Sequence, residues 1–367
     1  MMKDGISRRS FFKYFGLAAA AAAGIAGPKK EAFAARDYPS SSSLWQDRDA
    51  YLKDIIAWIP DIPLYQKKGA EVIGTVNFRH LPVNQYRKDG KSLVSLVYAG
   101  PDLKKDIKRA VDAIGGFGKA LRRTDRILLK PNFNSPDPPP AGSSLDFLAA
   151  VFQVLQDEGY TNLTLGESVG GPWGPSERVL KMIGADQLTR EHGVKLLNFE
   201  EGKWMDVPLN GEFLDVMAYP ASLQEFDKII YLPVMKTHFL AGFTMGLKLS
   251  QGLIHPADKG KVHADNHIFV AQRIAELNKV IHPDLIIMDG RRSFVSGGPA
   301  HGLAIEPGFV LASGDQIAND VWGVKILQQW QAVNKLNMYA WQLPQIAQAV
   351  RWELGARSDN EVALVRV

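Results

Sequence analysis

Short, almost continuous apolar runs alternate with amphipathic stretches between residues 93 and 330. The runs include LVSLVYAG, RILLKPNF, NLTLGES, FDKIIYLPVMKTH, PDLIIMDG and FVLASGD. Segments between them, such as SLDFLAAVFQVLQDEGY, have the apolar spacing of a helix that covers a sheet. Strands that are apolar on both faces are typical of parallel sheets buried between two helical layers. The pattern therefore predicts an α/β fold, with a mainly parallel sheet and helices on both faces.

One segment breaks this alternation. Residues 196–220 contain two strand-like runs around Asn210-Gly211, a strong turn signal, and they predict a β-hairpin inserted in the α/β scheme. The Gln- and Trp-rich C-terminal residues are expected to be helical. We expect four parts: a signal peptide at 1–34, an N-terminal extension and linker at 35–90, the α/β domain at 91–330, and a C-terminal helical extension at 331–367.

The first 34 residues have the composition of an export signal. A basic segment containing SRRSFFK precedes a mildly apolar, alanine-rich stretch, and Ala32 and Ala34 suit a signal peptidase. Arg8 and Arg9 match the twin-arginine pattern, so the twin-arginine translocase is the expected partner and the periplasm, or another extracytoplasmic space, is the expected location. Cleavage would leave no stable membrane span. An uncleaved anchor and a short helix of the fold are the alternatives.

Composition excludes several classes of protein. The 367 residues are 46% hydrophobic and 22% charged, as in globular proteins, and the formal net charge is +4. Much of the basicity lies in the first thirty residues, so the remainder is close to neutral and nucleic acid is not an expected partner. Since the chain has no cysteine, it cannot itself hold an iron–sulfur cluster, a thiolate zinc site or a disulfide. A bound metal would need His, Asp and Glu ligands.

Charged and polar residues follow the apolar runs. In an open parallel sheet, ligands bind beyond the carboxyl ends of the strands, where these residues are expected to meet. Lysines supply charge for a phosphate or carboxylate, and amide and hydroxyl groups supply oriented hydrogen bonds. The sequence therefore predicts a site for an anionic small molecule. The residues expected to bind it are Lys130, Asn132, Thr237, Thr244, Lys248 and, through the backbone of a glycine-rich loop, Gly297 and Gly298.

Four further residues at these strand ends are expected to carry chemistry: Lys236, His238, Glu167 and Asp289. Glu167 and Asp289 are expected either to hold a divalent metal or to shuttle a proton, and His238 is expected to be a general acid/base or a metal ligand. Asp315, after the run FVLASGD, is expected either to contact the ligand or to cap a helix. Structural roles are also open for Lys130, which precedes a proline at a strand end, and for Glu167, which can cap a helix.

Three histidines lie close together in HPADKGKVHADNH, at positions 255, 263 and 267. His263 and His267 have the i,i+4 spacing of two metal ligands on one helical face. Asp265 is expected to be the N-cap of the following helix, which leaves His263 outside that helix. The segment is therefore open to two interpretations, a metal site and a polar lid loop near the strand ends.

Five separated motifs resemble the family known as domain of unknown function 362: LLKPNFN, GES, PVMKTHFLAGFTMGLKLSQGLI, IIMDGRRSFVSGGPAHG and SGDQIANDVWG. The resemblance covers about residues 93–325 in order and spacing. It implies no settled reaction, and some relatives carry cysteine motifs for iron–sulfur clusters, which this chain lacks. The positions that fall on the family's motifs are Lys130, Asn132, Glu167, Lys236, Thr237, His238, Thr244, Lys248, Asp289 and Asp315.

Neither GxGxxG after the first strand nor a P-loop is present, so dinucleotide or ordinary nucleotide binding is not predicted. We expect an exported protein that binds an anionic small molecule and acts on it as an enzyme. The alternatives are a non-catalytic ligand-binding or assembly factor that uses the same residues, and a redox partner of a cluster-bearing protein.

The export signal yields a direct test. Changing Arg8 and Arg9 together to lysine is expected to retain the protein in the cytoplasm, because the receptor reads the arginine pair and not only its charge. Cell fractionation of the wild type and the double variant measures this. Periplasmic accumulation of the variant at the wild-type level would contradict a twin-arginine signal.

Overall fold

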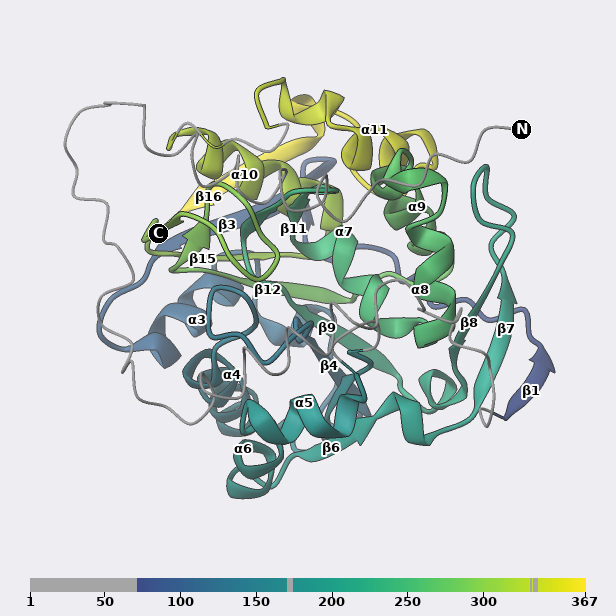
Figure 1. Ribbon diagram of the computed structural model, residues 1–367. Coiled ribbons are helices and arrows are strands. Elements are labelled where there is room, and N and C mark those ends of the chain that lie inside the picture. Colours follow the sequence, from purple (N-terminus) through teal and green to yellow (C-terminus); the bar gives the residue numbers. More distant parts are fainter. Residues whose placement is uncertain (1–70, 170–173, 331, 333–335) are drawn as a thin grey trace.

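The computed structural model describes residues 71–169, 174–330, 332 and 336–367 (Figure 1). Within them the principal element is a nine-stranded sheet of order β16-β3-β15-β12-β9-β4-β5-β6, with β2 paired to β3. Its strands are β2 (Arg87–Lys88), β3 (Lys91–Tyr98), β4 (Ile127–Pro131), β5 (Leu163–Glu167), β6 (Lys195–Asn198), β9 (Lys228–Leu232), β12 (Leu285–Gly290), β15 (Phe309–Ser313) and β16 (Val362–Arg366).

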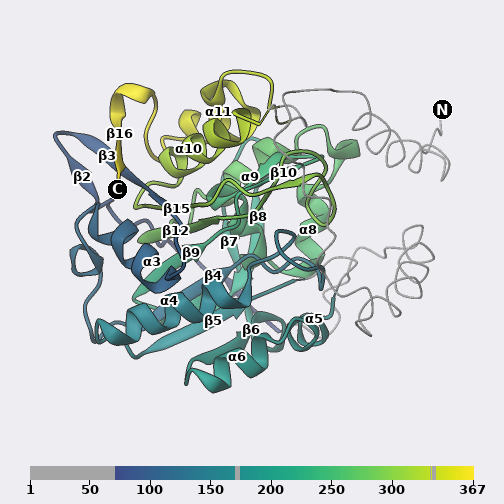
Figure 2. The same cartoon turned by 90° about the vertical axis from the view of Figure 1, so that its left-hand side faces the viewer.

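Most neighbouring strands of this sheet are parallel. The pairs β6-β5, β5-β4, β4-β9, β9-β12 and β3-β16 are parallel, whereas β15 is antiparallel to both β12 and β3, and β2 is antiparallel to β3. Helices cover both faces (Figures 1 and 2), so the predicted α/β class is confirmed. One face carries α3 (Leu103–Asp112), α4 (Leu145–Asp157), α5 (Ser176–Met182) and α6 (Ala185–Glu191). The other carries α7 (Gly246–Leu249), α8 (Pro256–Val262), α9 (Val270–Leu277), α10 (Gln316–Gln328) and α11 (Pro344–Arg351).

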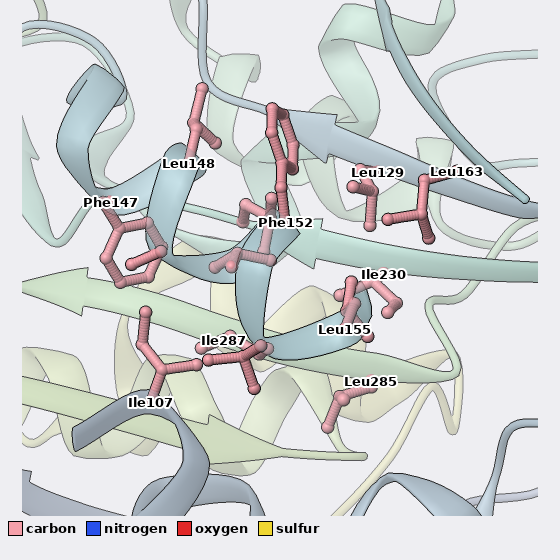
Figure 3. Close-up of a cluster of buried hydrophobic side chains, with 14 of the residues drawn as sticks. Ile107, Leu129, Phe147, Leu148, Phe152, Leu155, Leu163, Ile230, Leu285 and Ile287 are labelled. Atoms are coloured by element: carbon pink, nitrogen blue, oxygen red, sulfur yellow. The ribbon is translucent and has the colours of Figure 1, made fainter. Parts of the chain in front are cut away.

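Alternate residues of the strands build a core on each face. Leu129, Ile230 and Ile287 point towards α4, where Phe147 and Phe152 are fully buried against them (Figure 3). Their neighbours along the same strands, such as Leu128, Ile229 and Met288, enter the cores of the opposite face. Each fully buried side chain of this kind contributes roughly 1.5–3 kcal/mol. Burial on both faces is the reason that these strands read as continuous apolar runs.

The predicted hairpin is present as β7 (Trp204–Pro208) and β8 (Val216–Pro220), which pair antiparallel. Its connection is longer than a two-residue turn, because the N–H of Leu209 bonds to the carbonyl of Asp215 at 2.7 Å. Asn210 nevertheless adopts the positive φ of 48° that its turn signal suggests. β1 (Val72–Thr75) adds to β7 in parallel, so the hairpin belongs to a separate three-stranded sheet.

The C-terminal segment differs from the expectation of a purely helical extension. α11 is helical, but the chain then returns as β16 and pairs in parallel with β3 along residues 362–366. The short apolar run VALVR is a weak strand signal in the sequence. It forms a strand because the edge of β3 would otherwise have unpaired backbone groups, and β16 pairs with that edge.

The predicted export signal and most of the N-terminal extension, residues 1–70, lie outside the described residues. Among the helices that the structure describes, none is both long and apolar enough to cross a bilayer.

Asp315 does not lie at the predicted ligand edge. Because β15 runs antiparallel to β12, its carboxyl end lies at the opposite edge of the sheet. Asp315 is the N-cap of α10 and accepts the N–H groups of Ile317 and Ala318 at 3.0 Å. Its second oxygen accepts from the Ser92 hydroxyl at 2.7 Å and the Ala356 N–H at 2.8 Å. The capping interpretation is therefore the correct one.

Because Asp315 accepts hydrogen bonds from three segments, its removal is expected to destabilise the fold more than the loss of an ordinary helix cap. Asp315→Ala leaves buried donors from three segments without an acceptor, so we expect the free energy of unfolding to fall by about 3 kcal/mol. Asp102→Ala, which removes the exposed N-cap of α3, is the matched control and is expected to cost clearly less. Urea unfolding measures both, and equal losses would contradict the role of Asp315 as a buried junction.

Candidate functional site

The carboxyl ends of four neighbouring strands form the edge at which most predicted residues lie. Asp289 lies near the end of β12, Lys130 near the end of β4, and Glu167 ends β5. Lys236 begins β10 (Lys236–His238), shortly after β9. Because β12, β9, β4 and β5 are parallel neighbours in that order, all four residues share one edge of the sheet.

Lys130 and Glu167 form a buried ion pair. Lys130 Nζ lies 2.7 Å from Glu167 Oε2, and the two side chains are 1% and 2% exposed. The carboxylate also accepts the N–H groups of Phe133 at 2.9 Å and Ser168 at 3.0 Å. Burial lowers the pKa of Lys130 below its ordinary value, and the charge of Glu167 opposes that shift. A Cβ on Gly252 would lie 2.2 Å from Glu167 Oε1, so only glycine allows this backbone to cover the pair.

Lys236 is fully buried, yet no carboxylate of the described residues forms an ion pair with it. Its Nζ donates to the carbonyl oxygens of Pro299, at 2.9 Å, and Ala141. These carbonyls belong to two loops, one between β4 and α4 and one after β13 (Ser293–Phe294). Burial, and then the charge of Lys248, hold the pKa of Lys236 well below its ordinary value. Lys236 therefore ties two loops to the strand ends.

β10 pairs with β11 (Gly242–Thr244) as a short antiparallel hairpin, with Lys236 opposite Thr244 and Thr237 opposite Phe243. Since side chains alternate along a strand, Lys236, His238 and Thr244 share one face. Thr237 lies on the other face, beside Phe243. The motif MKTHFLAGFTMGLK thus brings together most, but not all, of the side chains that the sequence singled out.

His238 is held in one tautomer. Its Nδ1 accepts the backbone N–H groups of Leu240 at 3.2 Å and Ala241 at 3.3 Å, so the proton of the neutral ring is on Nε2. Burial, followed by the charges of Lys248 and Lys236, holds the pKa of His238 well below its ordinary value. His238 is therefore a neutral hydrogen-bond donor near pH 7, and its role as a general acid or base stays a prediction.

The glycine-rich loop packs against this hairpin. Gly297 and Gly298 have positive φ values of 67° and 73°. A Cβ on Gly298 would lie 2.0 Å from the carbonyl oxygen of Thr237, and the Phe239 N–H donates to the Gly298 carbonyl at 3.3 Å. The backbone at Gly298 is therefore in close contact with the backbone of β10, which is the reason that this position needs a glycine.

Asp289 is engaged by a neighbouring cation. Its carboxylate receives Arg291 Nε at 3.0 Å and Nη2 at 2.9 Å, and the Ser144 hydroxyl at 3.0 Å. Arg291 also bonds to Asp146 at 2.7 Å, and although burial opposes the shift, this contact holds the pKa of Asp146 at about 2. This network joins the start of α4 to the end of β12.

The proposed metal-ligand set of Glu167, His238 and Asp289 is not assembled. Among the residues that the structure describes, no three His, Asp or Glu side chains converge as ligands for a metal ion. The physical reason is that Glu167 is bound by Lys130, Asp289 is bound by Arg291, and His238 Nδ1 accepts backbone hydrogen bonds. A metal site built from these three residues was a wrong prediction.

Two cations from beyond the hairpin complete the edge. Lys248 on α7 donates to Gln251 Oε1 at 2.7 Å, and Lys259 on α8 donates to the carbonyl oxygens of Ser168, at 2.5 Å, and Val169, at 2.6 Å. Burial, then the charges of Lys259 and Lys130, lower the pKa of Lys248 to about 7. Burial lowers the pKa of Lys259 to about 8, although nearby carboxylates oppose it. We call Lys130, Lys236, Lys248 and Lys259 the lysine cluster.

The sequence did not single out Lys259. It lies in the segment interpreted as a polar loop, and no local signal distinguishes a lysine that points inwards from α8 from one in solvent. In the same segment, His263 and His267 meet at 3.1 Å between their Nδ1 atoms, although they do not share a helix. Asp265 is not the N-cap of α9, which is Phe269. It pairs instead with Arg273 on α9.

α7 is positioned by a buried carboxylate. Asp320 on α10 accepts the N–H groups of Gly246 and Leu247, each at 2.8 Å. Burial raises the pKa of Asp320 to about 7, while these two donors favour its charged form. The contact holds the first turn of α7 and thereby sets where Lys248 projects.

Three of the predicted binding residues hold buried polar atoms without a partner. Asn132 Nδ2, Thr237 Oγ1 and Thr244 Oγ1 form no hydrogen bond within the described part of the chain. Buried polar groups are normally satisfied by protein, water or ligand. Thr244 is the most informative of the three, because it shares the face of Lys236 and His238.

The ion pair tests how the edge is held together. Lys130→Met leaves the buried Glu167 side chain without its cationic partner, so we expect the free energy of unfolding to fall by about 3–5 kcal/mol. Glu167→Gln is expected to cost less, because Lys130 can lose its proton. Urea unfolding compares both with Lys181→Met, an exposed control with little expected effect. A Lys130→Met variant as stable as that control would contradict the account.

Comparison with known proteins identifies the family of the chain. The thylakoid-associated protein sll1697 of Synechocystis sp. is 27% identical over 245 residues, covering 64% of this chain and 73% of that protein. The lactate racemase apoprotein of Thermoanaerobacterium thermosaccharolyticum aligns with a TM-score of 0.35 and 11% identity, over 65% of this chain and 59% of the racemase. A family model described as Domain of unknown function (DUF362) matches residues 127–325, a span that begins with β4 and ends in α10. The chain therefore belongs to the DUF362 family, as its motifs predicted.

Proposed function

We propose that the carboxyl edge of the sheet binds a small anionic molecule at the lysine cluster. The observation that carries the proposal is an imbalance of buried charge. Within the described residues, Glu167 is the one carboxylate in ion-pair contact with any of the four lysines, and it contacts only Lys130. Burying a cation without a counter-ion is costly. A bound phosphate or carboxylate would supply the missing charge.

The lysines would play different parts. Lys130 is paired with Glu167, and Lys236 donates to two loop carbonyls, so both are expected to set the local potential. Lys248 and Lys259 are only half-buried and contact neutral oxygens. These two are the groups expected to meet the anion directly.

Neutral donors support the same proposal. The Nε2–H of His238 and the unpartnered hydroxyl of Thr244 share the face of Lys236, and both can donate to an oxyanion. A neutral imidazole contributes a hydrogen bond without adding a further buried charge. Asn132 Nδ2 is a third unpartnered donor at the end of β4.

We propose an extracytoplasmic location for this activity, supported by the Arg8–Arg9 pattern. Catalysis on the anion, as opposed to binding alone, is supported by Lys248, since an amine of pKa about 7 can exchange a proton near neutral pH.

Ligand-induced stabilisation tests the proposal. Thermal melts of the wild type with sulfate, phosphate and a panel of carboxylates are expected to show a raised melting temperature for at least one anion. At a concentration of 100 times Kd, binding adds roughly 2.7 kcal/mol. Lys248→Met is expected to abolish that shift. Its unliganded stability at about pH 6 is expected to equal or exceed the wild type, because below a pKa of about 7 the folded protein carries a buried, repelled charge there.

Lys195→Met is the matched control, since Lys195 is an exposed lysine at the start of β6. It is expected to respond to anions as the wild type does. Retention of the full shift by Lys248→Met, or no shift with any anion for the wild type, would sink the proposal.

A further inference from the structure

A chain of hydrogen bonds joins Lys248 to the protein surface. Lys248 Nζ lies 2.7 Å from Gln251 Oε1, Gln251 Nε2 lies 3.2 Å from His263 Nε2, and His263 Nδ1 lies 3.1 Å from His267 Nδ1. Along it the residues change from half-buried at Lys248 to exposed at His267. None of these links belongs to a helix or strand ladder, so the chain is built from side chains alone.

The direction of each bond follows from its ends. The ammonium of Lys248 can only donate, so Gln251 must present its oxygen to Lys248 and its amide N–H to His263. His263 Nε2 then accepts, which places the ring proton on Nδ1, facing His267. Burial, followed by the charge of Lys248, lowers the pKa of His263 to about 3, in keeping with a neutral ring. The chain is thus set to match a protonated Lys248, and Gln251 is its link to the amine.

The surroundings of Lys248 are cationic. The carboxylate on α10 that packs against α7, Asp320, contacts the backbone of α7. The Glu167 carboxylate pairs with Lys130. Several titratable groups interact electrostatically with Lys248. They are Lys130 on β4, Lys236 and His238 on β10, Lys259 on α8, and His263. A negative charge entering this cluster would therefore change the protonation of Lys248 more than that of a surface lysine.

We infer that Lys248 is the proton-exchanging group of this edge, taking up a proton from solvent as an anion binds and releasing it to solvent as the anion leaves, while Gln251 Oε1 accepts from the amine and holds it in place. The inference rests on the proposed anion binding and adds its mechanism. The inferred ligand is an anion that binds together with one proton. For a monovalent anion, binding therefore leaves the net charge of the protein unchanged. On binding, the amine nitrogen gains an N–H bond with a proton taken from water, and on release of the anion that bond breaks and the proton returns to water.

The sign of the pH dependence follows from linkage. In the free protein the amine of Lys248 has a pKa of about 7. An adjacent anion favours the ammonium form and raises that pKa. Affinity for the anion is therefore highest below about pH 7 and falls as pH rises through that value, approaching about tenfold per pH unit.

The test follows the Lys248 amine itself. The full chain is labelled with ¹³C,¹⁵N-lysine, and the Nζ resonances are followed by NMR from about pH 5 to about pH 10, with and without sulfate, which stays ionised throughout. Lys248→Arg assigns the resonance. We expect a midpoint near 7 without sulfate and a higher midpoint with it.

Two substitutions at Gln251 probe the link to the amine in opposite directions. Gln251→Glu gives Lys248 an anionic partner and is expected to raise its midpoint by at least about one unit, and to reduce its response to sulfate. Gln251→Leu removes the acceptor and is expected to lower the midpoint. Circular dichroism establishes that both variants are folded.

The outcomes separate this inference from the proposed function. If sulfate raises the melting temperature but leaves the Lys248 midpoint unchanged, anion binding stands and proton coupling is overturned. An ordinary Lys248 midpoint in the free protein overturns the inference by itself. If no anion stabilises the protein, the proposed function and the inference both fall.

Discussion

The structure depends on how it accommodates four lysine amines removed from bulk water at one edge of a sheet. Transferring a charge of this kind into a protein interior costs several kcal/mol even after relaxation. The chain offsets that cost differently at each amine: an ion pair at Lys130, two carbonyls at Lys236, an amide at Lys248 and two carbonyls at Lys259. Only the first supplies a full counter-charge. The remaining deficit is the basis for proposing an anionic ligand.

This edge also organises the loops around it. The two carbonyls bound by Lys236 come from loops that precede α4 and follow β13, and Lys259 clamps the backbone directly after β5. Asp289 and Arg291 join β12 to the start of α4. The same side chains that create the potential therefore also hold the surrounding backbone in place.

Much of the fold could be predicted from the sequence, because apolar strands and amphipathic helices have different periods. The strand-end rule correctly placed Lys130, Glu167, Lys236 and Asp289 at one edge. It failed at Asp315, since an apolar run does not reveal that β15 is antiparallel. Side-chain pairing could not be predicted from the sequence either. The contacts of Arg291 with Asp289 and Asp146, and the inward direction of Lys259, depend on how segments far apart in the chain pack together.

Anomalous diffraction from crystals grown with selenate tests the central claim most directly, because it locates an oxyanion without reference to activity. The account predicts a selenium peak within hydrogen-bond distance of Lys248 Nζ or Lys259 Nζ, on the face shared by His238 Nε2 and Thr244 Oγ1. The Lys248→Met protein is predicted to lack that peak. Selenium found only on exposed surface, with the lysine cluster empty or filled by water, would contradict it.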